Sequence, residues 1–289
     1  MTVSITSLCG YHQPSTKQTW EVPFSAISPQ RMSGGVQKPI SDQTSKPHPT
    51  PKAELMMNLE HLEKRIPVLT EHDAAEHAAW AYRVKDEWFQ MNMLAPAYIL
   101  GTAAYLETEW ETYTRKARAS NPLIQEGLGD VHGKIIDALR SEFDADFITD
   151  ERFSLPGLHI FMPSPFFRAR FGSCHFDRQW QILDLSPYTG IDTSSIISFT
   201  LPLEIPVGGA GLLLWTDKVD PEYSGPVTPG SGQGESTCKR VEYQVGELVV
   251  HDGWHLHEMA PFKTDEGELA RMTVQGHAIK CDRGWIVHW

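Results

Sequence analysis

The chain has 289 residues, of which 40% are hydrophobic and 10% aromatic, a content that supports a packed core and excludes a disordered chain. Its 25 basic and 37 acidic residues give a net charge of −12. This charge argues against a nucleic-acid partner and against an anionic membrane surface, and favours a small-molecule substrate. No secretory leader and no apolar run of about 18 residues is visible, so we expect no membrane association.

The four cysteines are far apart in the sequence and form no C-x-x-C pair. This spacing indicates neither a disulfide framework nor a zinc knuckle. We therefore expect free thiols and a cytoplasmic location.

The first half of the chain divides into an arm and a helical region. Residues 1–53 are rich in Ser, Thr, Gln and Pro without sustained periodicity, which is typical of an irregular arm. From Glu54 to Phe147, apolar residues return every three or four positions, which predicts helices. The runs concerned are LMMNLEHLEKRI, HDAAEHAAWAYRVKDEWFQMN, AYILGTAAYLETEWETYTRKA and VHGKIIDALRSEF. Thr70 and Asp73 are suitable caps for the second of them.

After Leu155-Pro156 the pattern changes to about nine short β-rich runs separated by Gly, Pro and Asp. Helices followed by strands predict an α+β chain with a mainly β core, built as a sandwich or barrel with the helices packed outside. We expect a single domain over residues 54–289, with helical support over 54–150 and the β core over 151–289. The helices either support the outer face of the barrel or form a homodimer surface.

A Gly-, Pro- and Ser-rich loop spans residues 217–237. A loop of this length within a compact β domain is typically a mobile lid or a disordered insert, and the sequence leaves both interpretations open.

The strongest chemical signal is His175-Phe176-Asp177 at the end of a strand-like run. Residues two apart in an extended chain point the same way, so the imidazole and the carboxylate can converge on one metal ion. A non-haem Fe(II) site of the facial-triad type needs a second histidine as well. His251, His255 and His257 compete for that place, and strand parity does not separate them unless Asp252-Gly253 forms a turn.

Two downstream residues favour His257 over the other histidines, because Pro261 follows it by four positions and Arg271 by fourteen. This order, H-x-D, a distant His and then Arg-x-Thr, resembles the Fe(II)/2-oxoglutarate-dependent dioxygenases, including the phytanoyl and prolyl hydroxylase types. The resemblance covers about residues 156–280. His255 is the alternative ligand, whereas His251 is expected to be structural or to support the ligands.

The resemblance implies a double-stranded β-helix, or jelly roll, with iron held by His175, Asp177 and His257. It also implies 2-oxoglutarate and O₂ as co-substrates, with succinate and CO₂ as products. An unactivated C–H bond of a small organic or amino-acid-derived substrate would be hydroxylated, desaturated or cyclised. Arg271 and Thr273, on one face of the strand ARMTVQGHAI, would bind the distal carboxylate of 2-oxoglutarate.

Other interpretations remain open at this point. The chain could be a cupin-like metal enzyme that does not use 2-oxoglutarate, a metal-free binding barrel, or a structural jelly roll. Arg168, Arg170 and Arg178 either bind an anionic substrate group or carry solvated surface charge. Trp180, Trp215 and Trp254 either line an apolar pocket or belong to the core of the barrel, and the sequence favours the pocket no more than the core.

Overall fold

The computed structural model describes residues 62–93, 95–170, 174–218, 236–263 and 269–289. The expected N-terminal arm over residues 1–53 lies outside these ranges, as does almost all of the loop over residues 217–237. The boundaries of the expected single domain therefore stay a prediction. Within the described residues, Cys174, Cys238 and Cys281 are free thiols, and no helix is both long and apolar enough to cross a membrane.

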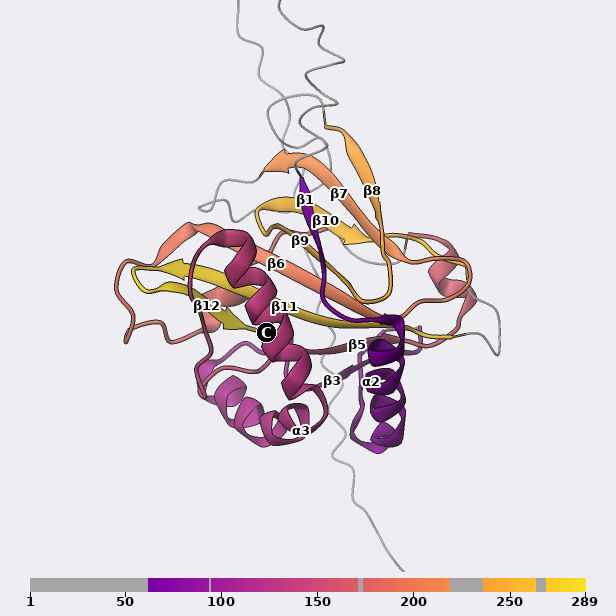
Figure 1. The fold of residues 1–289 in the computed structure, drawn as a ribbon, viewed down its shortest axis with the longest axis horizontal. Helices are drawn as coiled ribbons and strands as arrows, with labels where there is room; N and C mark the ends of the chain where they lie inside the picture. Colours follow the sequence, from indigo (N-terminus) through magenta and orange to yellow (C-terminus); the bar gives the residue numbers. More distant parts are fainter. Residues whose placement is uncertain (1–61, 94, 171–173, 219–235, 264–268) are drawn as a thin grey trace, which may run out of the picture. The chain divides into compact units, whose positions relative to one another are not determined.

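Two β-sheets form the centre of the fold (Figure 1). The larger sheet has the order β1-β9-β6-β11-β5-β3-β2, with β12 beside β11 and β4 beside β12; the smaller sheet has the order β10-β7-β8. All pairs are antiparallel except β12 with β4. The strands are β1 (Glu63–Pro67), β2 (Phe89–Gln90), β3 (Ala97–Leu100), β4 (Phe147–Ile148), β5 (Gly157–Phe161), β6 (Asp192–Glu204), β7 (Gly211–Lys218), β8 (Cys238–Glu242), β9 (Glu247–Asp252), β10 (His255–Met259), β11 (Arg271–Cys281) and β12 (Gly284–His288).

The order of strands identifies the architecture. His175 forms an antiparallel bridge with His257, so the segment around His175 adds a fourth member to the smaller sheet beside β10. In chain order, the eight core segments are then β5, the His175 segment, β6, β7, β8, β9, β10 and β11. The first, eighth, third and sixth form one sheet, and the second, seventh, fourth and fifth form the other. This order is that of a jelly roll, which confirms the predicted mainly β fold.

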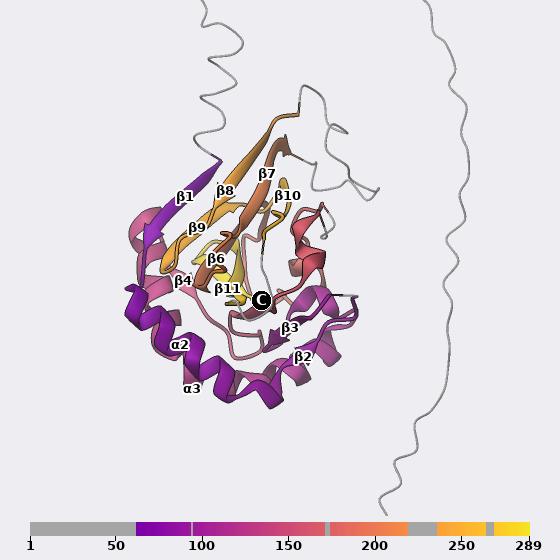
Figure 2. The same cartoon turned by 90° about the vertical axis from the view of Figure 1, so that its right-hand side faces the viewer.

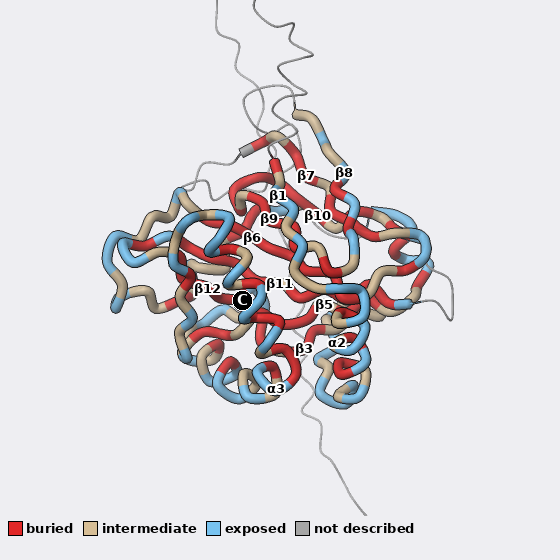
Figure 3. Tube along the Cα trace, viewed as in Figure 1, coloured by how far each residue is buried: buried red, intermediate tan, exposed pale blue. Residues whose placement is uncertain are grey.

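Two α-helices cover the larger sheet on the side away from the smaller one (Figure 2). They are α2 (Glu71–Arg83) and α3 (Trp110–Phe143). Ala78 and Leu128 of the helices pack in one core cluster with Leu158 and Leu201 of the sheet, and the buried residues follow this interface (Figure 3). Thr70 caps α2 as predicted, because its side chain accepts a hydrogen bond from the backbone N–H of Asp73.

The helical prediction is wrong at three places, where the chain forms strands on the larger sheet. The end of HDAAEHAAWAYRVKDEWFQMN forms β2, which pairs with β3. The end of LMMNLEHLEKRI forms β1, in which Ile66 pairs with Leu248 of β9. The start of AYILGTAAYLETEWETYTRKA forms β3, which pairs with β5 and is followed by Gly101, whose φ is +108°. A segment of four or five residues is too short for its apolar positions to distinguish a helical from a strand period, and pairing with an available strand decides between them. The last two predicted helices are joined in α3, which spans 34 residues.

The contact between α2 and α3 depends on Gly127. A Cβ atom at Gly127 would lie 1.9 Å from a ring carbon of Trp80, whereas one at Gly133 of the same helix would meet nothing within 4 Å. We expect Gly127→Ala to lower the free energy of unfolding by about 1–3 kcal/mol, because the added methyl group overpacks the interface.

Gly133→Ala serves as the matched control for this prediction. It should raise the free energy of unfolding by about 0.5–1 kcal/mol, since alanine is the better helix former. Urea unfolding measures both. Equal effects of the two substitutions would contradict the close approach of Trp80 to α3.

Candidate metal centre and cavity

His175, Asp177 and His257 converge at one end of the jelly roll. One ligand atom from each residue lies within 4.8 Å of the other two. The backbone holds them there: His175 N donates to His257 O at 3.0 Å, His257 N to His175 O at 2.8 Å, and Asp177 N to Gly253 O at 2.8 Å. The histidine from β10 therefore meets the H-x-D segment through direct strand pairing, although 80 residues separate His257 from Asp177 along the chain.

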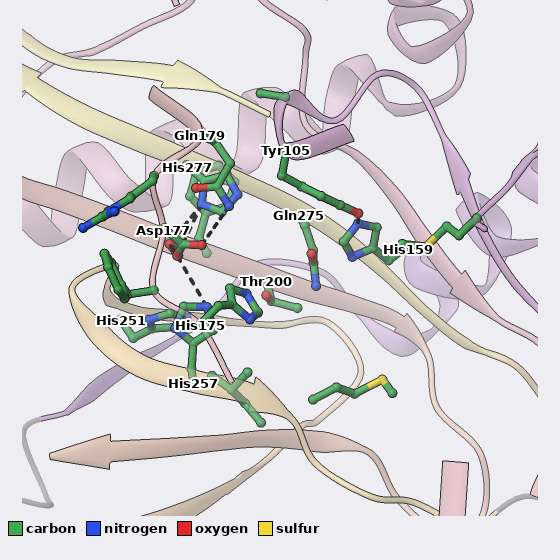
Figure 4. Close-up of a pocket in the computed structure, with 18 of the residues that line it drawn as sticks. Tyr105, His159, His175, Asp177, Gln179, Thr200, His251, His257, Gln275 and His277 are labelled. Atoms are coloured by element: carbon green, nitrogen blue, oxygen red, sulfur yellow. Dashed lines mark hydrogen bonds and ion pairs between the residues drawn. The ribbon is translucent and has the colours of Figure 1, made fainter. Parts of the chain in front are cut away.

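The three competing histidines have different surroundings (Figure 4). The Nε2 atom of His257 lies 3.5 Å from Oδ2 of Asp177, and its Nδ1 donates to the carbonyl of His255 at 2.8 Å. Burial lowers the pKa of His257, but the Asp177 carboxylate outweighs burial and raises it. In the neutral ring that a metal ion requires, the hydrogen bond to His255 keeps the proton on Nδ1 and leaves Nε2 with a lone pair directed at the site. The Nδ1 atom of His255 instead contacts the carbonyl of Trp215 at 3.0 Å. A bulge between His255 and His257, which shifts their register against β7, gives the two side chains different directions.

His251 lies next to this group without belonging to it. Its ring centroid is 4.6 Å from that of His257, and the side chain lines the same cavity. Burial lowers the pKa of His251 to about 3, so the imidazole is neutral at neutral pH. The turn at Gly253 and Trp254, which directly follows Asp252 at the end of β9, separates His251 on β9 from the histidines of β10.

Asp177 is almost fully buried, at 1% exposure, and has hydrogen-bond partners on both oxygens. Its Oδ1 accepts from Nε2 of Gln179 at 2.8 Å, and its Oδ2 accepts from the hydroxyl of Ser198. His277 contacts the same hydroxyl at 3.0 Å. Burial by itself raises the pKa of Asp177, but the histidines around it, His257 first, outweigh burial and hold the pKa well below its usual range. The group is therefore a carboxylate at neutral pH.

Sequence reasoning did not find the supporting residues Gln179 and Ser198, whereas His277 was expected on the same strand face as Arg271, in a structural or supporting role. Gln179 stands two positions after Asp177, but it lies in the short helix η4 (Gln179–Ile182), where strand alternation does not apply. Ser198 on β6 and His277 on β11 are opposite each other in the strand register. Only pairing of these two strands brings them to Asp177.

Gln179 offers a test of how the carboxylate is oriented. With Oδ1 held by the Gln179 amide, Oδ2 is the oxygen on the side of His257. We expect Gln179→Leu to weaken the affinity for a divalent metal ion by about 10- to 100-fold, because the loss of hydrogen bonds to ligating groups has effects of this size. Isothermal titration calorimetry with Fe(II) under anaerobic conditions measures the change in metal affinity.

The control for Gln179 is Gln125→Leu, on the outer part of α3. It should leave the metal affinity unchanged. An unchanged affinity in Gln179→Leu as well would mean that this amide does not orient the carboxylate.

Arg271 and Thr273 are both buried on β11, but they are placed differently. Arg271 is 2% exposed and lines the cavity, with its guanidinium carbon 5.0 Å from the ring centre of Phe161 and 5.4 Å from that of Tyr243. Its Nε atom has no acceptor among the described residues. Burial lowers the pKa of Arg271. The usual pKa of a guanidinium is so high that the group nevertheless stays charged.

Thr273 is fully buried, and its hydroxyl has no partner among the described residues. It is not one of the cavity-lining residues, whereas Gln275 and His277 further along the strand are. A bulge between Met272 and Thr273 interrupts the pairing of β11 with β6 at this point. Of the four residues expected on one face of β11, Arg271, Gln275 and His277 therefore line the cavity and Thr273 does not.

The cavity has a volume of about 530 Å³, which is in the range of small-molecule sites. His175, Asp177 and His257 lie in its wall, and Tyr105 and His159 lie across from Asp177 (Figure 4). The Tyr105 hydroxyl is 2.6 Å from Nε2 of His159. The apolar part of the wall consists of Met91, Met93, Ala104, Phe161, Phe176, Ile182, Phe199, Leu212 and Met259. Trp215 and Trp254 belong to a buried core cluster instead, and Trp180 packs against it.

Comparison with known proteins gives matches to solved structures. No family model matches the sequence, and neither does any curated protein. The non-haem α-ketoglutarate-dependent epimerase SnoN from nogalamycin biosynthesis is 16% identical, with coverage of 80% of this chain and 86% of that chain and a TM-score of 0.45. An N-substituted L-amino acid dioxygenase from Burkholderia ambifaria AMMD, in complex with α-ketoglutarate, is 14% identical, with coverage of 82% and 90% and a TM-score of 0.44.

A prolyl-4-hydroxylase from Pseudomonas putida is 16% identical, with coverage of 79% of this chain and 97% of that chain and a TM-score of 0.35. These similar structures are thus oxygenases and an epimerase, and two of the three descriptions name α-ketoglutarate. At this degree of similarity, the chemistry of the present site follows from its own residues.

Proposed function

We propose that the protein is an Fe(II)- and 2-oxoglutarate-dependent oxygenase that acts on a small organic molecule. The observation that carries this proposal is the convergence of His175, Asp177 and His257 in the wall of a cavity. Two imidazoles and one carboxylate are the ligand set of non-haem Fe(II) oxygenases, in which three further positions stay open for co-substrate and O₂.

The donor set supports an iron ion at this place. The hydrogen bond from Nδ1 of His257 to the His255 carbonyl directs Nε2 to the site, and the low pKa of Asp177 keeps its carboxylate charged. The hydrogen bond from Gln179 holds the carboxylate plane. Bound iron and 2-oxoglutarate would supply the oxidising chemistry, in which O₂ is consumed and succinate and CO₂ are released.

The buried polar atoms on β11 support binding of 2-oxoglutarate. The guanidinium of Arg271 lacks a carboxylate partner, and the hydroxyl of Thr273 lacks any partner, among the described residues. A carboxylate of 2-oxoglutarate in the cavity would offer acceptors to Arg271, because arginine binds a carboxylate through two parallel N–H···O bonds, whereas Thr273 does not line the cavity. The stacking of Arg271 between Phe161 and Tyr243 holds the guanidinium in place and keeps water away from it.

The direct test is anaerobic titration of the protein with Fe(II) in the presence and absence of 2-oxoglutarate. Chelation of iron by the keto acid gives a weak visible charge-transfer band, so the band should appear only when both are added. A screen for substrate-dependent release of succinate under O₂ then identifies the reaction. A metal-free binding protein would give neither the band nor succinate, and a metal enzyme that does not use 2-oxoglutarate would bind the metal without the band.

A further inference from the structure

Three arginines near the H-x-D motif are candidates for binding an anionic group, and the structure distinguishes them. Arg170 forms an ion pair with the buried Glu258 and lies over the ring of Trp215. Arg168 ends the short helix η3 (Pro165–Arg168) and is not among the residues that line the cavity. Arg178 lines the cavity, directly after Asp177 in the sequence.

The guanidinium of Arg178 is held on an aromatic ring with one edge unpaired. Its central carbon lies 4.4 Å from the ring centre of Phe176, which is within the range of a cation–π contact. Its Nε and Nη2 atoms are buried and have no acceptor among the described residues. Stacking uses the face of the guanidinium, whereas the N–H groups lie in its plane. Nε and Nη2 form the edge that matches the two oxygens of a carboxylate.

The charges around the cavity leave Arg178 without compensation. Glu107 also lines the cavity, but its carboxylate is 2.6 Å from the ammonium group of Lys116. Asp177 is engaged by Gln179 and Ser198. Elsewhere in the described part of this acidic protein, arginines commonly form ion pairs with carboxylates, as do Arg65, Arg140, Arg152, Arg170 and Arg240. Arg178 differs from these five arginines because two of its buried nitrogen atoms have no acceptor among the described residues.

We propose that Arg178 binds a carboxylate group of the substrate, and that the substrate is a small carboxylic acid with an apolar body. This inference rests on the proposed function, in which Arg271 serves the co-substrate and leaves Arg178 for the second anion. Because Arg178 directly follows Asp177, a carboxylate bound to Arg178 would lie near the proposed metal site. Phe176 and Ile182, which line the same cavity, provide apolar surface for the rest of the molecule.

The experiment compares matched acids and amides on the anaerobic complex of the protein with Fe(II) and saturating 2-oxoglutarate. The probes are 3-phenylpropanoate and hexanoate with their amides, 3-phenylpropanamide and hexanamide. Dissociation constants come from calorimetry and from changes in the charge-transfer band. Arg178→Gln removes the charge, Arg178→Lys keeps the charge without the fork, and Arg283→Gln, in the exposed turn between β11 and β12, is the matched control.

In the unmodified protein we expect the acids to bind about 10- to 100-fold more tightly than the amides, the range for hydrogen bonds to charged groups. Arg178→Gln should abolish this preference, Arg178→Lys should retain part of it, and Arg283→Gln should retain all of it. The affinities for Fe(II) and 2-oxoglutarate should stay the same in all variants.

Equal binding of acids and amides would overturn the inference, as would a preference that survives in Arg178→Gln or the absence of any binding by the acids while the band is present. Absence of the band itself in the unmodified protein would contradict the proposed function instead. The two failures are therefore distinguishable. A loss of folded structure in Arg178→Gln, detected by circular dichroism, leaves the acid-to-amide ratio of Arg178→Lys as the deciding value.

Discussion

Replacement of Asp177 by alanine is expected to abolish the release of succinate, by at least about a thousand-fold, or about 4 kcal/mol in the activation free energy. Asp177 would supply the only anionic ligand among the three converging side chains, and its oxygens lie in the wall of the cavity. Without it, two neutral imidazoles remain to hold the cation. Fe(II) affinity and O₂-dependent succinate release should both fall, while circular dichroism and thermal unfolding report an intact fold.

The matched control is Asp137→Ala on the exposed face of α3, where the carboxylate forms an ion pair with Arg140. This variant should bind iron and release succinate like the unmodified protein. Normal turnover by Asp177→Ala would remove the proposed oxygenase function, because no other described carboxylate belongs to the group that could hold the metal.

The second large effect concerns Arg271, whose replacement by alanine should raise the 2-oxoglutarate concentration needed for half-maximal turnover by about 100-fold. Truncation of one partner of a buried, hydrogen-bonded charge pair costs about 2–5 kcal/mol. Arg271 is buried between Phe161 and Tyr243, so water cannot easily replace the lost donors. The affinity for Fe(II) alone should change little, because Arg271 is not part of the group of potential ligands.

Two further variants, one conservative substitution and one control, test the same prediction. Arg271→Lys should give an intermediate 2-oxoglutarate requirement, since lysine keeps the charge but loses the planar fork. Lys263→Ala removes an exposed cation and should have no effect. If Arg271→Ala leaves the requirement unchanged, the carboxylate anchor lies elsewhere in the cavity.

The prediction of the site from sequence depended on one local rule and one choice. Alternation along an extended chain put His175 and Asp177 on the same side, and the two side chains do converge. The choice among His251, His255 and His257 could not be made by alternation, because all three share parity. The bulge after His255 and the hydrogen bond of His255 to Trp215 separate them, and both depend on pairing with β7.

The strands at Glu63–Pro67 and Ala97–Leu100 illustrate the same limit for the fold. Their apolar residues fit a helical period over so few positions, and each joins a strand that lies more than 50 residues further along the chain. The partner strand supplies hydrogen bonds that a short isolated helix would not have, so the tertiary contact outweighs local preference.

The amino-acid sequence by itself determined the mainly β core, the cap of α2 and the pair His175 and Asp177, because these depend on residues within a few positions of each other. Only the tertiary structure decided that His257 faces Asp177, that Gln179, Ser198 and His277 surround the carboxylate, and that Arg178 rather than Arg168 or Arg170 lines the cavity. The contacts of His257, Ser198 and His277 depend on strand pairing, and Arg178 and Gln179 reach the site from the start of the short helix η4. The geometry of a bulge is a property of two strands together rather than of either one alone.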